Sequence, residues 1–180
     1  MSCIIEEGAS NMLGESKMKI MKVRFELNGR KVEANTSPYT SLTVMLRDEL
    51  VIKSVKIGCE HGECGACTIL VNGLPMTSCI ILAPQVEGQH ITTLEGLEHN
   101  PLMIDLRQAF IENGAIQCGF CTPGMLISSY ALLRDNPSPT QEEVKMGIEG
   151  NICRCTGYIK IIEAVLDAAE RITSERTEDN

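Results

Sequence analysis

Nine cysteines stand in this chain of 180 residues, and eight of them fall into two groups. The first cysteine group has the spacing C-x4-C-x2-C-x11-C and consists of Cys59, Cys64, Cys67 and Cys79. Plant-type [2Fe–2S] sites take three thiolates from one loop with this C-x4-C-x2-C spacing and a fourth from further along the chain. The spacing therefore predicts one binuclear iron–sulfur cluster held by these four thiolates.

The loop around the first cysteine group is rich in glycine, with Gly58, Gly62 and Gly65 between or beside the cysteines. A cluster with four thiolate ligands is an anion, and its sulfurs need backbone N–H donors. Glycines let a loop wrap closely with its amides pointing inward, because they accept positive φ and carry no Cβ. We expect the fourth ligand, Cys79, to come from a nearby hairpin strand.

Two other metal sites are conceivable for the first cysteine group. A structural zinc site usually joins two short C-x2-C knuckles, whereas this group has one short pair, one x4 spacing and one distant cysteine. A Rieske centre replaces two cysteines by histidines. His61 lies close to Cys59, but the group ends in Cys67 and not in a histidine. We therefore expect four thiolates, with His61 near the cluster and not a ligand.

The second cysteine group combines a C-x2-C pair with a C-x-C pair and consists of Cys118, Cys121, Cys153 and Cys155. Each pair stands just ahead of a predicted helix. Helix N-termini present free N–H groups and a partial positive charge, which suit an anionic cluster. Two such helix starts that meet in a bundle would hold four thiolates around a second cluster.

The elements that must position these cysteines differ between the two parts of the chain. Residues 20–34 and 68–81 predict two hairpins, because Asn28-Gly29 and Asn72-Gly73 interrupt their apolar runs. Residues 41–50 carry a helical apolar stripe, and residues 90–94 suit one more strand. The first part is thus a small α+β unit.

Four helices are predicted after residue 97, over residues 101–112, 123–135, 140–148 and 158–172. Pro101 and Pro123 suit first helical turns. Thr122 is the candidate N-cap before Pro123, and Thr140 begins a capping box. The division predicted from these patterns is an extension (1–18), an α+β domain (19–97), a helical domain (98–173) and a tail (174–180).

Composition excludes several classes of function. The net charge is −8 and no basic stripe is present, which argues against nucleic-acid binding. No apolar run approaches the ~20 residues of a membrane span, and no signal peptide is evident, so a cytoplasmic location is expected. In that compartment many cysteines indicate metal and not disulfides. Cys3, outside both groups, is interpreted as a free thiol.

Three stretches together resemble one family, the small iron–sulfur subunits of the molybdenum hydroxylases, or xanthine oxidase family. They are Gly58-Cys59-Glu60-His61-Gly62-Glu63-Cys64-Gly65-Ala66-Cys67-Thr68, Gln117-Cys118-Gly119-Phe120-Cys121-Thr122-Pro123-Gly124-Met125 and Gly150-Asn151-Ile152-Cys153-Arg154-Cys155-Thr156-Gly157-Tyr158. The resemblance extends over about residues 20–172. It implies a β-grasp, plant-type ferredoxin-like domain followed by a four-helix-bundle domain.

The resemblance also implies partners and a direction of electron flow. Such subunits assemble with a large molybdopterin-binding subunit and a medium FAD-binding subunit, here expected as a heterotrimer. Electrons would leave the molybdenum centre one at a time and reach FAD through the two [2Fe–2S] clusters. By motif match, Gln117 would hydrogen-bond the pterin, and Cys155 would be the cluster ligand closest to it.

Substrate chemistry is not expected on this chain, because it contains no acid–base pair or nucleophile constellation. The resemblance places substrate on the large subunit, and family frequency favours an aldehyde or another small organic molecule. Two alternatives stay open from the residues alone. One is a free-standing two-cluster carrier of the ferredoxin type, and the other is a structural zinc module without redox function.

Overall fold

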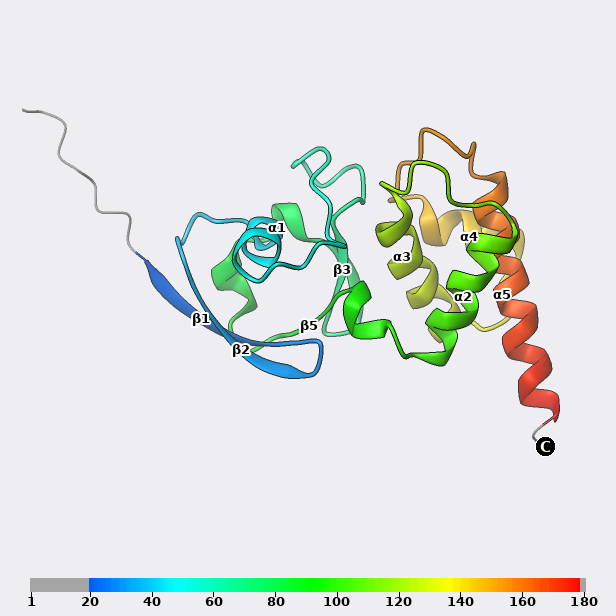
Figure 1. Ribbon diagram of the computed structural model, residues 1–180, viewed down its shortest axis with the longest axis horizontal. Coiled ribbons are helices and arrows are strands. Elements are labelled where there is room, and N and C mark those ends of the chain that lie inside the picture. The colour runs from blue at the N-terminus through cyan, green and yellow to red at the C-terminus, as the bar shows by residue number, and fades with distance from the viewer. Residues whose placement is uncertain (1–19, 179–180) are drawn as a thin grey trace, which may run out of the picture.

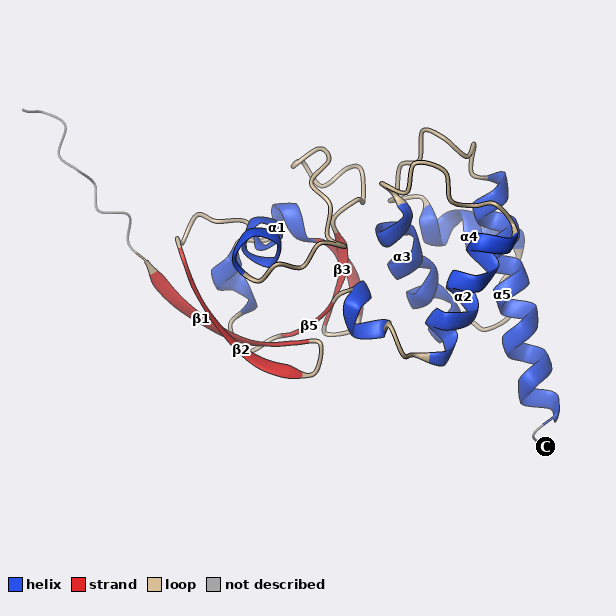
Figure 2. Ribbon diagram, in the orientation of Figure 1, coloured by secondary structure: helices blue, strands red, loops and turns tan. Residues whose placement is uncertain are grey.

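The computed structural model describes the chain from residue 20 to residue 178, and its side chains to residue 174. Cys3 and the predicted extension over residues 1–18 lie outside the described residues. The fold is mixed, with a β-sheet toward one end of the molecule and a set of packed helices toward the other (Figure 1; Figure 2). No helix among residues 20–178 is long and apolar enough to cross a membrane.

The sheet has five strands in the order β2-β1-β5-β3-β4. β1 (Met21–Leu27) pairs antiparallel with β2 (Arg30–Thr36), and β3 (Thr68–Val71) pairs antiparallel with β4 (Leu74–Thr77). The central strand β5 (His90–Thr92) is parallel to β1 and antiparallel to β3. Both predicted hairpins are confirmed, since each Asn-Gly pair turns with positive φ at both residues, as a type I′ turn requires.

One face of the sheet is covered by the segment between β2 and the cysteine-rich loop. α1 (Leu42–Val44) continues directly into a π-helix (Met45–Glu49), and Leu42, Met45 and Leu46 are fully buried against the sheet. The predicted helix over residues 41–50 is confirmed in place. The Leu50 N–H donates to the Met45 carbonyl at 3.1 Å, which is the i→i−5 bond of a π-helix. An apolar stripe does not distinguish a π-helix from an α-helix.

The strand expected to carry Cys79 is shorter than predicted. β4 ends at Thr77, and a 3₁₀ helix (Ser78–Ile80) follows, so Cys79 lies on a tight turn and not on the strand. Two further 3₁₀ helices, Ala83–Val86 and Leu94–Leu97, flank β5.

Four longer helices follow, as predicted: α2 (Pro101–Glu112), α3 (Thr122–Asp135), α4 (Gln141–Ile148) and α5 (Ile159–Glu178). The capping box at Thr140 is confirmed, with Glu143 bonding back to the Thr140 N–H. The expected N-cap at Thr122 is wrong, because α3 starts one residue earlier. Cys121 occupies the N-cap position, and Thr122 is already inside the helix.

α5 continues to Glu178, beyond the predicted end at residue 172. No glycine or proline follows Ile172 to stop it. The Thr173 hydroxyl donates to the Ala169 carbonyl at 2.8 Å, a backbone contact that a helical turn provides.

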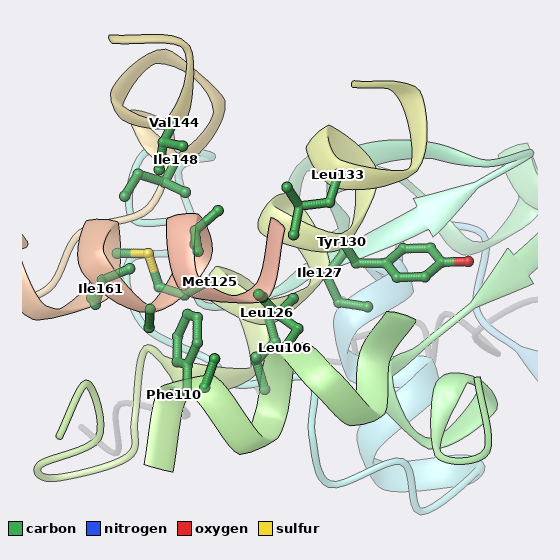
Figure 3. Close-up of a cluster of buried hydrophobic side chains, with 14 of the residues drawn as sticks. Leu106, Phe110, Met125, Leu126, Ile127, Tyr130, Leu133, Val144, Ile148 and Ile161 are labelled. Atoms are coloured by element: carbon green, nitrogen blue, oxygen red, sulfur yellow. The ribbon is translucent and has the colours of Figure 1, made fainter. Parts of the chain in front are cut away.

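Side chains from all four long helices meet in one hydrophobic core (Figure 3). Leu106 and Phe110 come from α2, Met125 and Leu133 from α3, and Ile161 from α5. A separate core lies under the sheet and holds Val23, Phe25, Leu42, Met45 and Ile69. Loops that project from these two cores carry most of the cysteines.

Candidate metal centres

Both cysteine groups gather at one edge of the molecule. Figure 1 shows three loops side by side at the top of the view. One contains residues 58–67, and the other two precede α3 and α5. A backbone hydrogen bond joins them, because the Ile152 N–H donates to the Cys64 carbonyl at 2.9 Å. The two groups are therefore adjacent in space, although the sequence separates them by tens of residues.

In the first cysteine group, Cys59 is surrounded by backbone donors. Its Sγ accepts hydrogen bonds from the N–H groups of His61 and Cys64, both at 3.4 Å. The His61, Cys64 and Glu63 amides, in that order, lower the pKa of Cys59 to about 6. This is the inward-facing amide loop that an anionic sulfur site requires.

Glycine at position 58 provides space for the sulfur of Cys64. A Cβ at Gly58 would lie 2.7 Å from the Cys64 Sγ, closer than atoms can approach. The glycine-rich composition of this loop therefore has a steric reason.

Cys67 and Cys79 form the second pair of the first group. The Ser78 hydroxyl donates to the Cys67 carbonyl at 2.8 Å, and it lies 2.6 Å from the buried Thr43 hydroxyl. These contacts hold the 3₁₀ turn of Cys79 against Cys67. Burial, and then the neighbouring Cys67 thiol, raise the pKa of Cys79 to about 11.

In the second cysteine group, Cys118 and Cys155 lie with their sulfurs 3.5 Å apart, and both are exposed. The Phe120 N–H and then the Cys155 thiol lower the pKa of Cys118. The adjacent Cys118 sulfur raises the pKa of Cys155. The Cys155 thiol thus donates a hydrogen bond to the Cys118 sulfur.

Cys121 and Cys153 form the inner pair of the second group. Burial, followed by the neighbouring Cys153 sulfur, raises the pKa of Cys121 to about 12. Burial acts in the same sense on Cys153, but hydrogen bonds from the Thr156 hydroxyl and from nearby amides outweigh it and lower the Cys153 pKa. The inner pair of the second group therefore combines a donor-rich sulfur, Cys153, with a desolvated one, Cys121.

The arrangement fits a binuclear cluster in each group. A cavity of about 180 Å³ is bounded by all four cysteines of the second group together with Cys64, Phe120 and Ile152. Among the side chains of residues 20–174, no three of His, Cys, Asp or Glu converge on a single ion position. The sulfurs instead stand in pairs, and a [2Fe–2S] cluster takes two thiolates on each of two irons.

The other residues singled out in the sequence lie at the surface of the two cysteine loops. His61 contacts Cys59 through its backbone N–H. Arg154 is exposed between its two cysteines. The side chain of Gln117 is exposed next to Cys118, and no hydrogen bond engages it among the described residues.

Asn151 is the contributor that sequence reasoning missed. Its side chain is only 3% exposed, and its Nδ2 donates to the Gly65 carbonyl at 3.0 Å. Its Oδ1 accepts from the Ser128 hydroxyl at 2.6 Å. The amide thus links both cysteine loops to α3. The sole hint in the sequence was its place two residues before Cys153.

Two protein-family models match the chain. Residues 27–109 match the 2Fe-2S iron-sulfur cluster binding domain, and residues 93–166 match the [2Fe-2S] binding domain. Together they cover both cysteine groups.

Relatives that match this chain over nearly their whole length support a more specific family assignment. The chain is 47% identical to the nicotinate dehydrogenase small FeS subunit of Eubacterium barkeri, covering 86% of this chain and 98% of that one. It is 47% identical to the nicotine 6-hydroxylase small subunit of Paenarthrobacter nicotinovorans, covering 84% and 92%. A chain of the quinoline 2-oxidoreductase structure from Pseudomonas putida 86 superimposes with a TM-score of 0.81 at 41% identity, covering 86% and 97%.

The chain belongs to the small iron–sulfur subunits of the xanthine oxidase family, which confirms the resemblance drawn from its motifs. Members are subunits of multisubunit oxidoreductases, and their place in these enzymes implies electron transfer.

Proposed function

We propose that this chain carries electrons from a molybdenum–pterin centre to FAD through two [2Fe–2S] clusters. Each cluster, when bound, takes up and releases one electron at a time. Cys59, Cys64, Cys67 and Cys79 would hold the first cluster, and Cys118, Cys121, Cys153 and Cys155 the second. The molybdenum cofactor and FAD would reside on partner subunits.

The observation that carries this proposal is the pairing of the eight thiols. Sulfurs lie together as Cys59 with Cys64, Cys67 with Cys79, Cys118 with Cys155, and Cys121 with Cys153. Two pairs per group suit two irons per site, whereas one zinc ion would draw four sulfurs to a single point. The pairing thus favours electron transfer over a structural zinc role.

The short path between the two groups supports transfer within the chain. The Ile152 N–H donates to the carbonyl of Cys64, and Ile152 is bonded directly to Cys153. One hydrogen bond and a few covalent bonds therefore separate a proposed ligand of one cluster from a proposed ligand of the other.

We assign the fold as a β-grasp, plant-type ferredoxin-like domain over residues 19–97 and a four-helix-bundle domain over residues 98–173. The mixed sheet order and the two separate cores support this assignment. The helical part would face the molybdenum subunit, because Cys118 and Cys155 are the exposed thiols among the cysteines that the structure describes. Gln117, exposed beside them, would offer its amide to the pterin, with Cys155 the nearest ligand.

The partners we propose are a large molybdopterin-binding subunit and a medium FAD-binding subunit in a heterotrimer located in the cytoplasm. Substrate would bind on the large subunit. Within the predicted class of aldehydes and other small organic molecules, the relatives named for nicotinate, nicotine and quinoline favour a nitrogen heteroaromatic.

The test is to purify the chain with whatever subunits accompany it, reduce the sample with dithionite and record its EPR spectrum. Iron and zinc are quantified on the same sample. We expect two distinct S = 1/2 signals and about four irons per chain, as two binuclear clusters require. Zinc without such signals would establish the structural alternative. Two signals in a chain that purifies alone would establish the free-standing carrier.

A further inference from the structure

A hydroxyl group lies against one sulfur of the second cysteine group. The Thr156 Oγ1 is 3.1 Å from the Sγ of Cys153. The backbone N–H of Tyr158 donates to the same Oγ1 at 3.2 Å. Because the Tyr158 amide already occupies an acceptor position of this oxygen, the hydroxyl proton is left free to point at the sulfur.

The direction of this hydrogen bond follows from the state of the sulfur. A cysteine that ligates iron is a thiolate, which has lone pairs but no proton. The sulfur can then only accept, and Thr156 is the donor. Cys153 is only 7% exposed, so water competes little for the sulfur, and the bond is stronger than it would be at the surface.

The backbone N–H groups of Thr156 and Cys155 also face the Cys153 sulfur, and the Thr156 hydroxyl adds a side-chain donor to them. The N–H of Cys153 is turned away, since it donates to the Tyr158 hydroxyl at 3.0 Å. Tyr158 reaches this position with a φ of 68°, in the left-handed region. Among the described residues, Thr156 provides the one side-chain hydroxyl recorded within hydrogen-bond distance of a cysteine sulfur.

We propose that Thr156, acting through Cys153, raises the reduction potential of the second cluster. The proposal rests on the proposed function above. Reduction adds one electron to the cluster and no bond forms or breaks, while the proton stays on the Thr156 oxygen. The added negative charge spreads partly onto the thiolates, so a hydrogen bond to sulfur stabilises the reduced state more than the oxidised state.

The experiment is an EPR-monitored redox titration of the purified complex and of three variants. Thr156→Val keeps the shape and removes the donor, whereas Thr156→Ser keeps the donor. Thr122→Val is the matched control, because Thr122 follows Cys121 directly but makes no recorded hydrogen bond to a sulfur in the described chain. We expect Thr156→Val to shift the second cluster to a more negative potential. The reduction potential of the first cluster should not change in this variant, and both potentials should be unchanged in Thr156→Ser and Thr122→Val.

The results separate this inference from the proposed function. Lack of two iron–sulfur signals in the unmodified complex would refute the proposed function itself. With both signals present, an unchanged second potential in Thr156→Val would overturn the role of Thr156. If Thr156→Val fails to load the second cluster, Thr156→Ala repeats the comparison. Loss of the signal in both, with a normal Thr156→Ser, would make the hydroxyl an assembly determinant and would equally overturn a tuning role.

Discussion

The side-chain amide of Asn151 donates a hydrogen bond to the carbonyl oxygen of Gly65, 3.0 Å away, across 86 positions of sequence. This contact joins the loop of the first cysteine group to the loop of the second. The Ile152 N–H also donates to the Cys64 carbonyl at 2.9 Å, and the loops lie so close that a Cβ at Gly65 would be 2.3 Å from the Gly150 carbonyl oxygen. The two loops are in direct backbone contact, and Asn151 fixes how they meet.

Replacing Asn151 by Asp tests this junction. An aspartate has the same shape and can still accept from Ser128, but it cannot donate to Gly65 and sets a carboxylate against a carbonyl. The Gly65 oxygen keeps the Thr68 N–H and hydroxyl as donors, but the new carboxylate oxygen is buried against it without a donor of its own, which costs about 1–3 kcal/mol. For a chain of this size each kcal/mol lowers the Tm by about 2–4 °C. Thermal unfolding of the purified complex, followed by visible absorption, measures the loss.

Ser128→Ala is the graded comparison for Asn151→Asp. It removes one partner of the Asn151 oxygen and leaves the bond to Gly65 intact, so we expect a smaller decrease in Tm. An Asn151→Asp variant as stable as the unmodified chain would show that the amide does not hold the junction.

Gly124→Ala should push the helices away from the first cysteine loop. A Cβ at Gly124 would lie 2.2 Å from the Gly65 carbonyl oxygen, a backbone atom that cannot rotate aside. We expect a loss of about 1–3 kcal/mol from this overpacking. Gly150→Ala is the matched control, since a Cβ there meets no atom within 4 Å. Similar Tm values for the two variants would contradict the close contact.

Cys118→Ser and Cys155→Ser should each remove the second EPR signal and cut turnover. Both residues belong to one sulfur pair, so either loss opens the same side of the proposed site. The signal assigned to Cys59, Cys64, Cys67 and Cys79 should persist, because its ligands come from a separate loop and turn. Disappearance of both signals together would refute independent binding by the two groups.

Thiol reactivity in the iron-free chain should follow the local pKa values. Cys59, with a pKa of about 6, loses its proton as the pH rises through 6, and it should be alkylated readily at pH 7. Cys79 and Cys121, with pKa values of about 11 and about 12, stay protonated and should react slowly. Peptide mapping after brief iodoacetamide treatment from pH 5 to pH 9 measures this order.

The denatured chain provides the reference for that alkylation series. In the denatured chain Cys59, Cys79 and Cys121 should be alkylated alike, with half-maximal reactivity at a pH near the ordinary pKa of a cysteine thiol. Equal labelling of Cys59 and Cys79 at pH 7 in the folded chain would show that the backbone amides do not stabilise the Cys59 thiolate.

Local signals predicted much of the fold. Asn28-Gly29 fixes a hairpin and Thr140 with Glu143 fixes a helix start, because each feature depends on neighbouring residues alone. The cysteine spacing likewise predicts that Cys118 and Cys155 lie together, because each stands shortly before the start of a helix.

Features set by distant contacts could not be predicted in this way. Cys79 lies on a 3₁₀ turn because Ser78 bonds to Cys67, eleven residues earlier, and to Thr43. Thr122 failed as an N-cap because the backbone at Cys121 is already helical, with φ −79° and ψ −18°, so Thr122 lies within α3. Asn151 gains its role from Gly65 and Ser128, which no short pattern connects to it.

The contact between Gly65 and Asn151 has a consequence for how such enzymes diversify. It fixes the spacing of the two cysteine groups inside one polypeptide, so that no partner is needed to set it. On the proposed function, a change in the subunit that binds substrate would leave this internal spacing untouched.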